Sequence, residues 1–221
     1  MILQNWARSY EWTIRALETG VERRAHVVCL QEPPRERGEI GISHSAYEIR
    51  KRTSFSTVIR KGSGMVVDKW TDLRRGANDD VMATDGRRRG EKITRIVNIY
   101  NQKEERSGER PAQKLDLQRV IRQGGTVLAG EFNARSKRWD PRCQLQRGAT
   151  FWEGVIDENG LEIGNDGWPT HHRTSEDQDD ESVLDLMLAN RPIVRWTKRA
   201  DDHATGSDHE VIEWEVGVDR Q

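Results

Sequence analysis

A strand–helix–strand pattern in the first 30 residues constrains the fold more than any other feature of the chain. Residues 1–4 are predicted to form a short strand. A helix is predicted next, because apolar residues recur with the spacing of one helix face at Tyr10, Ile14, Leu17 and Val21. Residues 27–30 form a continuous apolar run, as in a buried strand, and Pro33 and Pro34 end it. This order is typical of an α/β domain.

Strands outnumber helices along the rest of the chain. Further strands are predicted at residues 58–59, 65–67, 93–100, 126–129, 183–188 and 211–216. Helices are predicted after Pro111, which suits a first helical position, and over residues 151–158, where Asn159 and Gly160 follow. Residues 35–41 and 174–181 are predicted to be polar loops. Because no repeat or linker divides the chain, residues 1–221 are predicted to form a single domain.

Composition excludes several classes of protein. Hydrophobic residues make up 34% and charged residues 33% of the chain, and the formal net charge is −1. This balance excludes a generally basic nucleic-acid binder, so phosphate contacts must come from local basic patches. Cys29 and Cys143 cannot build a disulfide framework, and neither has the spacing of a zinc site. No apolar stretch approaches the length of a membrane span, so we expect a soluble, intracellular protein without a membrane partner.

Candidate functional groups lie at the ends of the predicted strands. They are Glu32, Tyr100, Glu131, Asn133, Asp185, Asp208 and His209. Strand ends project side chains into a shared cleft at the edge of a sheet. Carboxylates and amides without thiolates suit a hard cation such as Mg²⁺ or Mn²⁺.

Each of these motifs also has a purely structural interpretation. Glu32 can be a solvated loop acid, and Ser207-Asp208-His209 can be a turn that caps the last strand. Ser182 and Asp185 can be polar residues of a loop and an edge strand. The order of the motifs along the chain matches that of a known family, and this resemblance favours the functional interpretation over four independent coincidences.

The ordered set resembles the endonuclease/exonuclease/phosphatase superfamily, and within it the endonuclease domains of non-LTR (LINE-type) retrotransposons, relatives of apurinic/apyrimidinic endonucleases. The segments that carry the resemblance are Leu30-Gln31-Glu32-Pro33, Val97-Asn98-Ile99-Tyr100-Asn101, Leu128-Ala129-Gly130-Glu131-Phe132-Asn133-Ala134 with Trp139-Asp140, Ser182-Val183-Leu184-Asp185-Leu186 and Ser207-Asp208-His209. The resemblance implies a four-layer α/β sandwich of the DNase I-like kind, with two mixed sheets packed face to face and helices outside. It also implies a monomeric, nuclear, metal-dependent enzyme that nicks DNA.

The resemblance implies that Mg²⁺ or Mn²⁺ would be bound by Glu32, Asp208 and Asn5. The ion would offset charge on the phosphoryl oxygens in the transition state. Asn5 stands in Gln4-Asn5-Trp6, where family members have a strand that ends in Gln-x-Asn.

The resemblance also implies catalytic roles for five residues. His209 would contact the scissile phosphate or activate the attacking water, and Asp185 would orient it. Tyr100 would direct its hydroxyl at the phosphate. Asn133, with Glu131 beside it, would hold the nucleophile or the phosphate.

Among the basic clusters, the one after Asn133 is the best placed to bind DNA. Arg135, Lys137 and Arg138 follow the predicted catalytic strand end directly. The segment His171-His172-Arg173 could flank a substrate groove, or could be polar residues of a strand.

Three departures from the family pattern leave alternatives open. This chain has Glu131 where the family has Asp, the shortened Gln4-Asn5 start, and Arg135 where many relatives have His. The leading hypothesis is a DNA-nicking endonuclease of a retrotransposon-derived protein, impaired by Glu131. The alternatives are a degenerate, non-catalytic remnant, or a superfamily phosphatase that acts on a small phosphorylated substrate.

Overall fold

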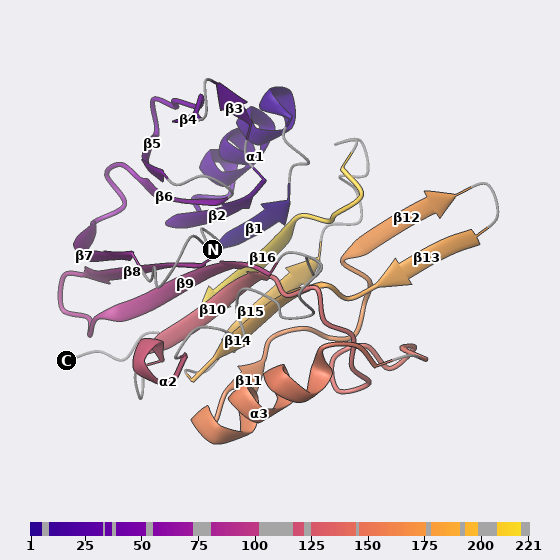
Figure 1. Ribbon diagram of the computed structural model, residues 1–221. Coiled ribbons are helices and arrows are strands. Elements are labelled where there is room, and N and C mark those ends of the chain that lie inside the picture. Colours follow the sequence, from indigo (N-terminus) through magenta and orange to yellow (C-terminus); the bar gives the residue numbers. More distant parts are fainter. Residues whose placement is uncertain are drawn as a thin grey trace.

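The computed structural model describes residues 1–5, 9–32, 34–36, 39–51, 55–72, 81–101, 117–121, 125–144, 146–175, 178–190, 193–198 and 207–217. Two six-stranded sheets dominate it (Figure 1). The first sheet contains, in spatial order, β15 (Ile193–Lys198), β16 (Ile212–Val216), β1 (Ile2–Asn5), β2 (Val27–Gln31), β6 (Phe55–Arg60) and β5 (Tyr47–Lys51). The second contains β11 (Glu162–Ile163), β14 (Asp185–Ala189), β10 (Thr126–Glu131), β9 (Thr94–Tyr100), β8 (Val81–Arg88) and β7 (Met65–Asp72).

Two hairpins stand apart from these sheets. β12 (His171–Ser175) pairs with β13 (Gln178–Ser182), and β3 (Arg35–Glu36) pairs with β4 (Glu39–Ile40). The β12–β13 hairpin projects from the sandwich at the right of Figure 1.

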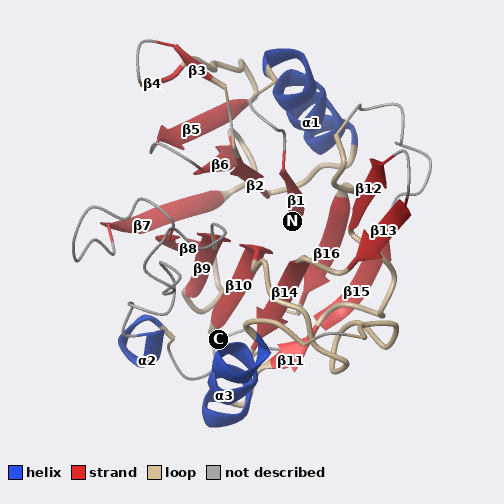
Figure 2. Cartoon of the chain, turned by 45° about the vertical axis from the view of Figure 1, so that its right-hand side comes forward, coloured by secondary structure: helices blue, strands red, loops and turns tan. Residues whose placement is uncertain are grey.

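Within the described residues, three helices cover the outer faces of the sheets. α1 (Tyr10–Glu22) begins at Ser9, whose side chain accepts a hydrogen bond from the amide of Trp12, and it lies over the first sheet. α2 (Leu117–Val120) and α3 (Ala149–Asn159) lie over the second sheet (Figures 1 and 2). α3 ends at Gly160, which adopts the left-handed conformation that suits a glycine after a helix.

Separate hydrophobic clusters fill the three spaces between these four layers. α1 packs on the first sheet through a cluster that includes Leu17, Val28 and Leu30. The two sheets meet through a cluster that includes Val27, Cys29, Ile96, Val127, Ala129, Met187 and Trp214. The second sheet packs on α2 and α3 through a cluster that includes Val97, Leu117, Val120, Leu128 and Trp152. The predicted four-layer sandwich is confirmed.

The strand alternation decides which side chains reach the candidate site. Successive side chains of a strand point to opposite faces of its sheet. In β10, Val127 and Ala129 face the first sheet, whereas Leu128 faces the helices. The next residue on the inner face is Glu131, the last residue of β10. The inner face of this strand therefore changes from apolar to acidic at its carboxyl end.

Gly130 allows β9 and β10 to approach each other closely. Its φ of 154° lies in a region that side chains rarely adopt, and a Cβ atom built there would lie 1.8 Å from the carbonyl oxygen of Ile99. Only glycine fits this position without a backbone shift.

Several elements differ from their sequence-based predictions. Residues 174–181 do not form a loop, because residues 171–175 and 178–182 pair as the strands of a hairpin. Residues 35–41 contain the two short strands β3 and β4. The strand predicted at residues 183–188 begins only at Asp185, and β5, β8 and β15 lie where no strand was predicted. Pro111 lies outside the described residues, and α2 follows it.

Across the segments described above, no helix is long and apolar enough to cross a membrane.

We expect Gly130→Ala to destabilise the protein by about 3 kcal/mol or more, because the methyl group meets a backbone oxygen that cannot move aside. Thermal denaturation should show a melting temperature lower by roughly 6–12 °C. Gly154→Ala is the matched control, since its new methyl group has nothing within 4 Å and Gly154 lies inside α3. That change should instead stabilise the protein by about 0.5–1 kcal/mol. Equal melting temperatures for the two variants would contradict the close approach at Gly130.

Candidate active site

Three predicted site residues form one row across the second sheet. Glu131 pairs in register with Tyr100 of β9 on one side and with Asp185 of β14 on the other. Residues paired in register project to the same face of a sheet. Ala129 and Met187, two residues away along the strands, belong to the cluster between the sheets. The row therefore continues the inner face of the sandwich at the point where it turns polar.

His209 joins this row through Asp185. Its Nδ1 lies 2.7 Å from Oδ2 of Asp185, and both residues are buried. Burial disfavours the charged imidazole, but the carboxylates of Asp185, Glu131 and Asp208 outweigh this effect and raise the pKa of His209 to about 9. The two residues that were predicted to act as a pair are therefore in direct contact.

The backbone around Asp185 is held by two polar side chains from the segment before β12. The hydroxyl oxygen of Thr170 accepts hydrogen bonds from the amides of Leu184 and Asp185, at 3.0 and 2.9 Å. The side chain of Asn165 donates to the carbonyl oxygen of Asp185 and accepts from the amide of Met187. These bonds fix the first residues of β14, and with them the Asp185 carboxylate.

Asn133 lies beside Glu131 in a strained conformation. Its φ of 50° is in the left-handed region, which asparagine tolerates better than most residues. Its amide nitrogen donates to Oε1 of Glu131 and to the carbonyl oxygen of Asn101, at 2.5 and 2.9 Å. The side chain of Asn101 in turn donates to the carbonyl oxygen of Phe132. The two candidate groups at 131 and 133 are thus held together by direct contact.

Glu32 comes from the other sheet and reaches the row through Tyr100. It follows the last residue of β2 with a φ of 45°, which is uncommon for a glutamate. The hydroxyl of Tyr100 donates to Oε1 of Glu32 at 2.6 Å. Directly before Glu32, the fully buried Gln31 donates from Nε2 to Oδ1 of Asn98 in β9. The two sheets are therefore bridged by polar contacts beside the candidate site.

Asn5 ends β1 next to the same region. It pairs in register with Gln31, the residue before Glu32. Its side chain lies outside the described residues. Its place as a metal ligand stays a prediction.

Asp208 lies on the solvent side of the site, with about half of its side chain exposed. Its Oδ2 is 3.4 Å from Nε2 of His171. Contact with His171 is the largest effect on this carboxyl group, and with the charge of His209 it lowers the pKa of Asp208 to about 2 despite partial burial. Asp208 is therefore ionised at neutral pH.

His171 belongs to the site, although the sequence placed it only in a segment that could flank a substrate groove. Its ring packs edge-on against His209, with the centroids 4.8 Å apart, and its side chain is buried. Nδ1 of His171 is 3.5 Å from the hydroxyl oxygen of Ser182, the residue paired with it across the β12–β13 hairpin. Of the two interpretations of the segment His171-His172-Arg173, the structure supports polar strand residues, but it also places one of them inside the site.

The three basic residues predicted to bind DNA, Arg135, Lys137 and Arg138, lie in different environments. Arg135 is partly buried, forms a β-bridge with Arg147 and donates to the Ser182 hydroxyl at 3.4 Å. Lys137 is exposed. Arg138 forms an ion pair with Asp157 of α3, at 2.7 Å. Arg135 is thus the member of the cluster that contacts the hairpin beside His171.

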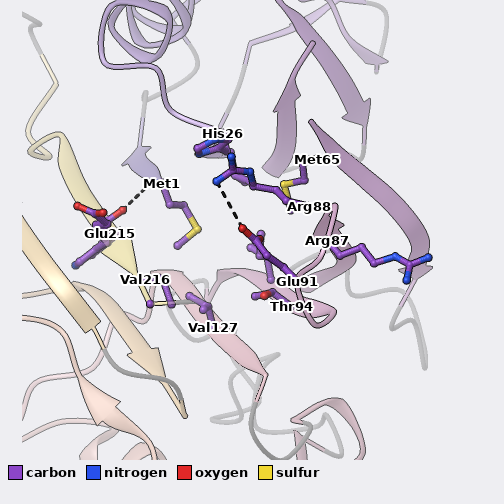
Figure 3. Close-up of a pocket in the computed structure, with 15 residues that line it drawn as sticks. Met1, His26, Met65, Arg87, Arg88, Glu91, Thr94, Val127, Glu215 and Val216 are labelled. Carbon is purple, nitrogen blue, oxygen red and sulfur yellow. Dashed lines mark hydrogen bonds and ion pairs between the residues drawn. The ribbon is translucent and has the colours of Figure 1, made fainter. Parts of the chain in front are cut away.

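A separate pocket of about 240 Å³ opens at the opposite end of the sandwich (Figure 3). Its lining includes Val27 and Val127, which stand at the start of β2 and β10, whereas the candidate site lies at the ends of these strands. Arg88 and Glu91 form an ion pair in its wall, at 3.6 Å. The pocket does not belong to the site.

Solved structures share this fold over nearly the whole chain. The endonuclease domain of TRAS1, a telomere-specific non-LTR retrotransposon, superposes with a TM-score of 0.77 and 17% identity, covering 97% of this chain and 96% of that domain. The 3′ phosphatase NExo from Neisseria, bound to a product DNA hairpin, gives 0.65 and 14%, covering 98% and 99%. The D. rerio TDP2 complex with a single-strand DNA product gives 0.63 and 9%, covering 98% of each chain. At these identities the likeness establishes the fold.

Sequence comparison establishes the family. No curated protein matches this chain at a significant level. The sequence model described as endonuclease-reverse transcriptase matches residues 94–213, more than half of the 221 residues. The match spans Tyr100, the segment around Glu131 and Asn133, the Asp185 strand and the Asp208-His209 turn. The chain therefore belongs to the endonuclease-reverse transcriptase family.

Proposed function

We propose that this protein is a divalent-metal-dependent phosphodiester hydrolase that nicks DNA, as an endonuclease of a retrotransposon-derived protein would. The observation that carries the proposal is the buried pair of Asp185 and His209, set in one row with Glu131 and Tyr100. A buried titratable group whose pKa is strongly shifted by a specific charged partner is typical of functional sites. Family membership and the nuclease fold support a nuclease in general.

His209 is proposed to act as a cation toward the scissile phosphate. With a pKa raised to about 9, its imidazole is protonated at neutral pH in the metal-free protein. A protonated imidazole donates hydrogen bonds and cannot accept a proton. Because Asp185 engages Nδ1, the nitrogen proposed to donate to a phosphoryl oxygen is Nε2. We therefore propose that His209 contacts the phosphate through Nε2.

The residues at the site fit a hard divalent ion. Asp208 is ionised, Glu32 adds a second carboxylate, and the amide of Asn5 would complete the set that we propose to hold Mg²⁺ or Mn²⁺. Within the described residues, Oδ1 of Asp185 is buried without a hydrogen-bond partner, as expected for an oxygen that faces a polar ligand. Such an ion would offset negative charge on the phosphoryl and leaving oxygens.

Glu131 and Asn133 are proposed to place the attacking water. The amide nitrogen of Asn133 is directed at Glu131 and at the backbone of residue 101, so its amide oxygen is the atom that would hold the water. Tyr100 shares its hydroxyl hydrogen with Glu32, and this contact would be exchanged for one with the phosphate. The contacts of Asn133 and Tyr100 with the two glutamates therefore hold these side chains in position before a substrate binds.

DNA is the proposed substrate, and local basic groups would bind it. Arg135 and Lys137 follow closely after the carboxyl end of β10, where the proposed catalytic residues lie. Arg138 would have to break its ion pair with Asp157 before it could bind DNA. Two of the similar structures, NExo and TDP2, hold DNA products, which supports a nucleic-acid substrate. A monomeric state, a single domain over residues 1–221 and nuclear localisation stay predictions from the sequence.

With Mg²⁺ or Mn²⁺, the purified protein should convert supercoiled plasmid to open circles and leave 3′-hydroxyl and 5′-phosphate ends. Agarose gels and end-labelling measure both outcomes. His209→Ala, which removes the proposed phosphate donor, is the control for a contaminating nuclease. Nicking that survives excess EDTA, or that leaves a 3′-phosphate, would overturn the proposal. The absence of nicking by well-folded protein would favour the non-catalytic remnant, and release of phosphate from small phosphomonoesters alone would favour a phosphatase.

Asp185→Asn should lower the nicking rate on the order of 100-fold, because the neutral amide no longer orients and charges His209. Combining it with His209→Ala should cost little more than His209→Ala alone, since the two groups act as a unit. Single-turnover nicking rates of the four proteins provide this comparison.

The pairing of Asp185 with His209 can also be tested by a measurement that does not depend on nicking activity. In metal-free protein, the pKa of His209 measured by NMR should fall from about 9 toward its ordinary value of 6.5 in Asp185→Asn. Additive losses of rate, together with an unchanged titration of His209, would contradict the pairing.

Glu131→Asp should raise the nicking rate by ~10-fold or more, because it removes one methylene, about 1.5 Å, from a side chain that positions the nucleophile. The melting temperature should change little, since the charge is kept. Glu131→Gln is the matched control: it keeps the length, removes the charge and should lower the rate. If Glu131→Asp leaves the rate unchanged, Glu131 does not limit the enzyme.

A further inference from the structure

We propose that His171, Asp208 and His209 form a binding site for a divalent transition-metal ion such as Zn²⁺ or Co²⁺. This site would be distinct in chemistry from the oxygen-rich set proposed for Mg²⁺, with which it shares Asp208. The inference concerns metal binding alone and does not depend on whether the protein nicks DNA.

The three side chains lie close to the spacing of metal ligands. One ring nitrogen of each histidine and one oxygen of Asp208 all lie within 4.8 Å of one another. Donors about 2.0–2.2 Å from a tetrahedral zinc ion are about 3.3–3.6 Å apart. The distance of 3.4 Å between Nε2 of His171 and Oδ2 of Asp208 falls in this range. Only a small movement of His209 would then complete a three-ligand site.

The backbone holds the ligands in place. His171 and His209 face each other in an antiparallel β-bridge. On either side of it, the amide of His172 donates to the carbonyl oxygen of Asp208 at 2.7 Å, and the amide of Glu210 donates to that of Thr170 at 2.8 Å. Because these bonds join residues far apart in sequence, folding itself brings the three ligands together. Little conformational entropy remains to be lost when an ion binds.

Each histidine also has a partner behind it. Nδ1 of His209 contacts Asp185, which is the carboxylate–histidine arrangement that orients metal ligands and raises their basicity. Nδ1 of His171 lies near the Ser182 hydroxyl. In both rings the outer contact uses Nδ1, so Nε2 is the nitrogen that would bind the ion. The proton that His209 carries on Nε2 in the metal-free protein would pass to solvent when the ion binds.

The composition of the set selects the class of ion. Two imidazoles and one carboxylate suit Zn²⁺, Co²⁺ and related ions, whereas Mg²⁺ prefers oxygen ligands. The two histidines are buried, while Asp208 is about half exposed and opens the site to solvent. Three protein ligands beside solvent leave room for a water molecule as the fourth ligand.

Titrating Co²⁺ into metal-free protein tests the site through visible absorption, and calorimetry with Zn²⁺ gives the stoichiometry. We expect one ion per chain, bound through nitrogen and oxygen, that a large excess of Mg²⁺ does not displace. His171→Asn keeps a polar atom near Ser182 but removes Nε2, and it should weaken binding by at least about tenfold. Asp208→Asn alters an exposed group, so it should fold normally and should weaken binding similarly.

His172→Asn is the matched control, because His172 is the next residue of β12 and faces Glu210 and Glu181, at 2.8 and 3.4 Å. It should bind Co²⁺ as the unmodified protein does. Loss of binding in His172→Asn but not in His171→Asn or Asp208→Asn would overturn the proposal. The same holds if the unmodified protein shows no Co²⁺ spectrum, or if Mg²⁺ displaces Co²⁺ at comparable concentration.

Discussion

Side chains of the sandwich interior and of the candidate site point the same way, because both follow the two-residue period of β9, β10 and β14. Ile96, Val127 and Met187 pack between the sheets, and residues of the same parity further along these strands are Tyr100, Glu131 and Asp185. The pairing register places these three side by side. A shift of one residue in any strand would turn its polar group toward the helices.

Polar contacts between the sheets begin where the apolar interior ends. Gln31 and Asn98 meet across the two sheets and are fully buried. Oε1 of Gln31 has no hydrogen-bond partner within the described residues, so the pair lowers stability relative to an apolar contact. A buried amide pair of this kind accepts only one relative position of the sheets. It thereby sets the position of Glu32, the next residue along the chain.

The parts of the fold that the sequence predicts are those where local pattern and burial agree. Residues 27–30 and 127–129 are apolar throughout because both faces of these strands are covered. Glu32 directly follows the first strand and Glu131 ends the second, so the strand ends agree with the prediction. β13 was missed because Gln178–Ser182 has no apolar residue, and pairing with β12 holds it. The sequence left the role of His171 open, between the flank of a groove and a polar strand residue, for a related reason. Its contacts with Asp208 and His209 depend on a β-bridge between distant segments, which no local pattern encodes.

The end of a strand is where hydrogen bonds normally open first, since the last residues have few neighbours to hold them. β14 begins differently: Thr170 and Asn165 bond to the backbone of the residues around Asp185 with their side chains. Fraying at this end would release the carboxylate that holds His209. The hydroxyl and the amide therefore act as clamps on local motion. This strand end is ordered when the protein folds. Substrate binding therefore carries no further entropic cost for ordering it.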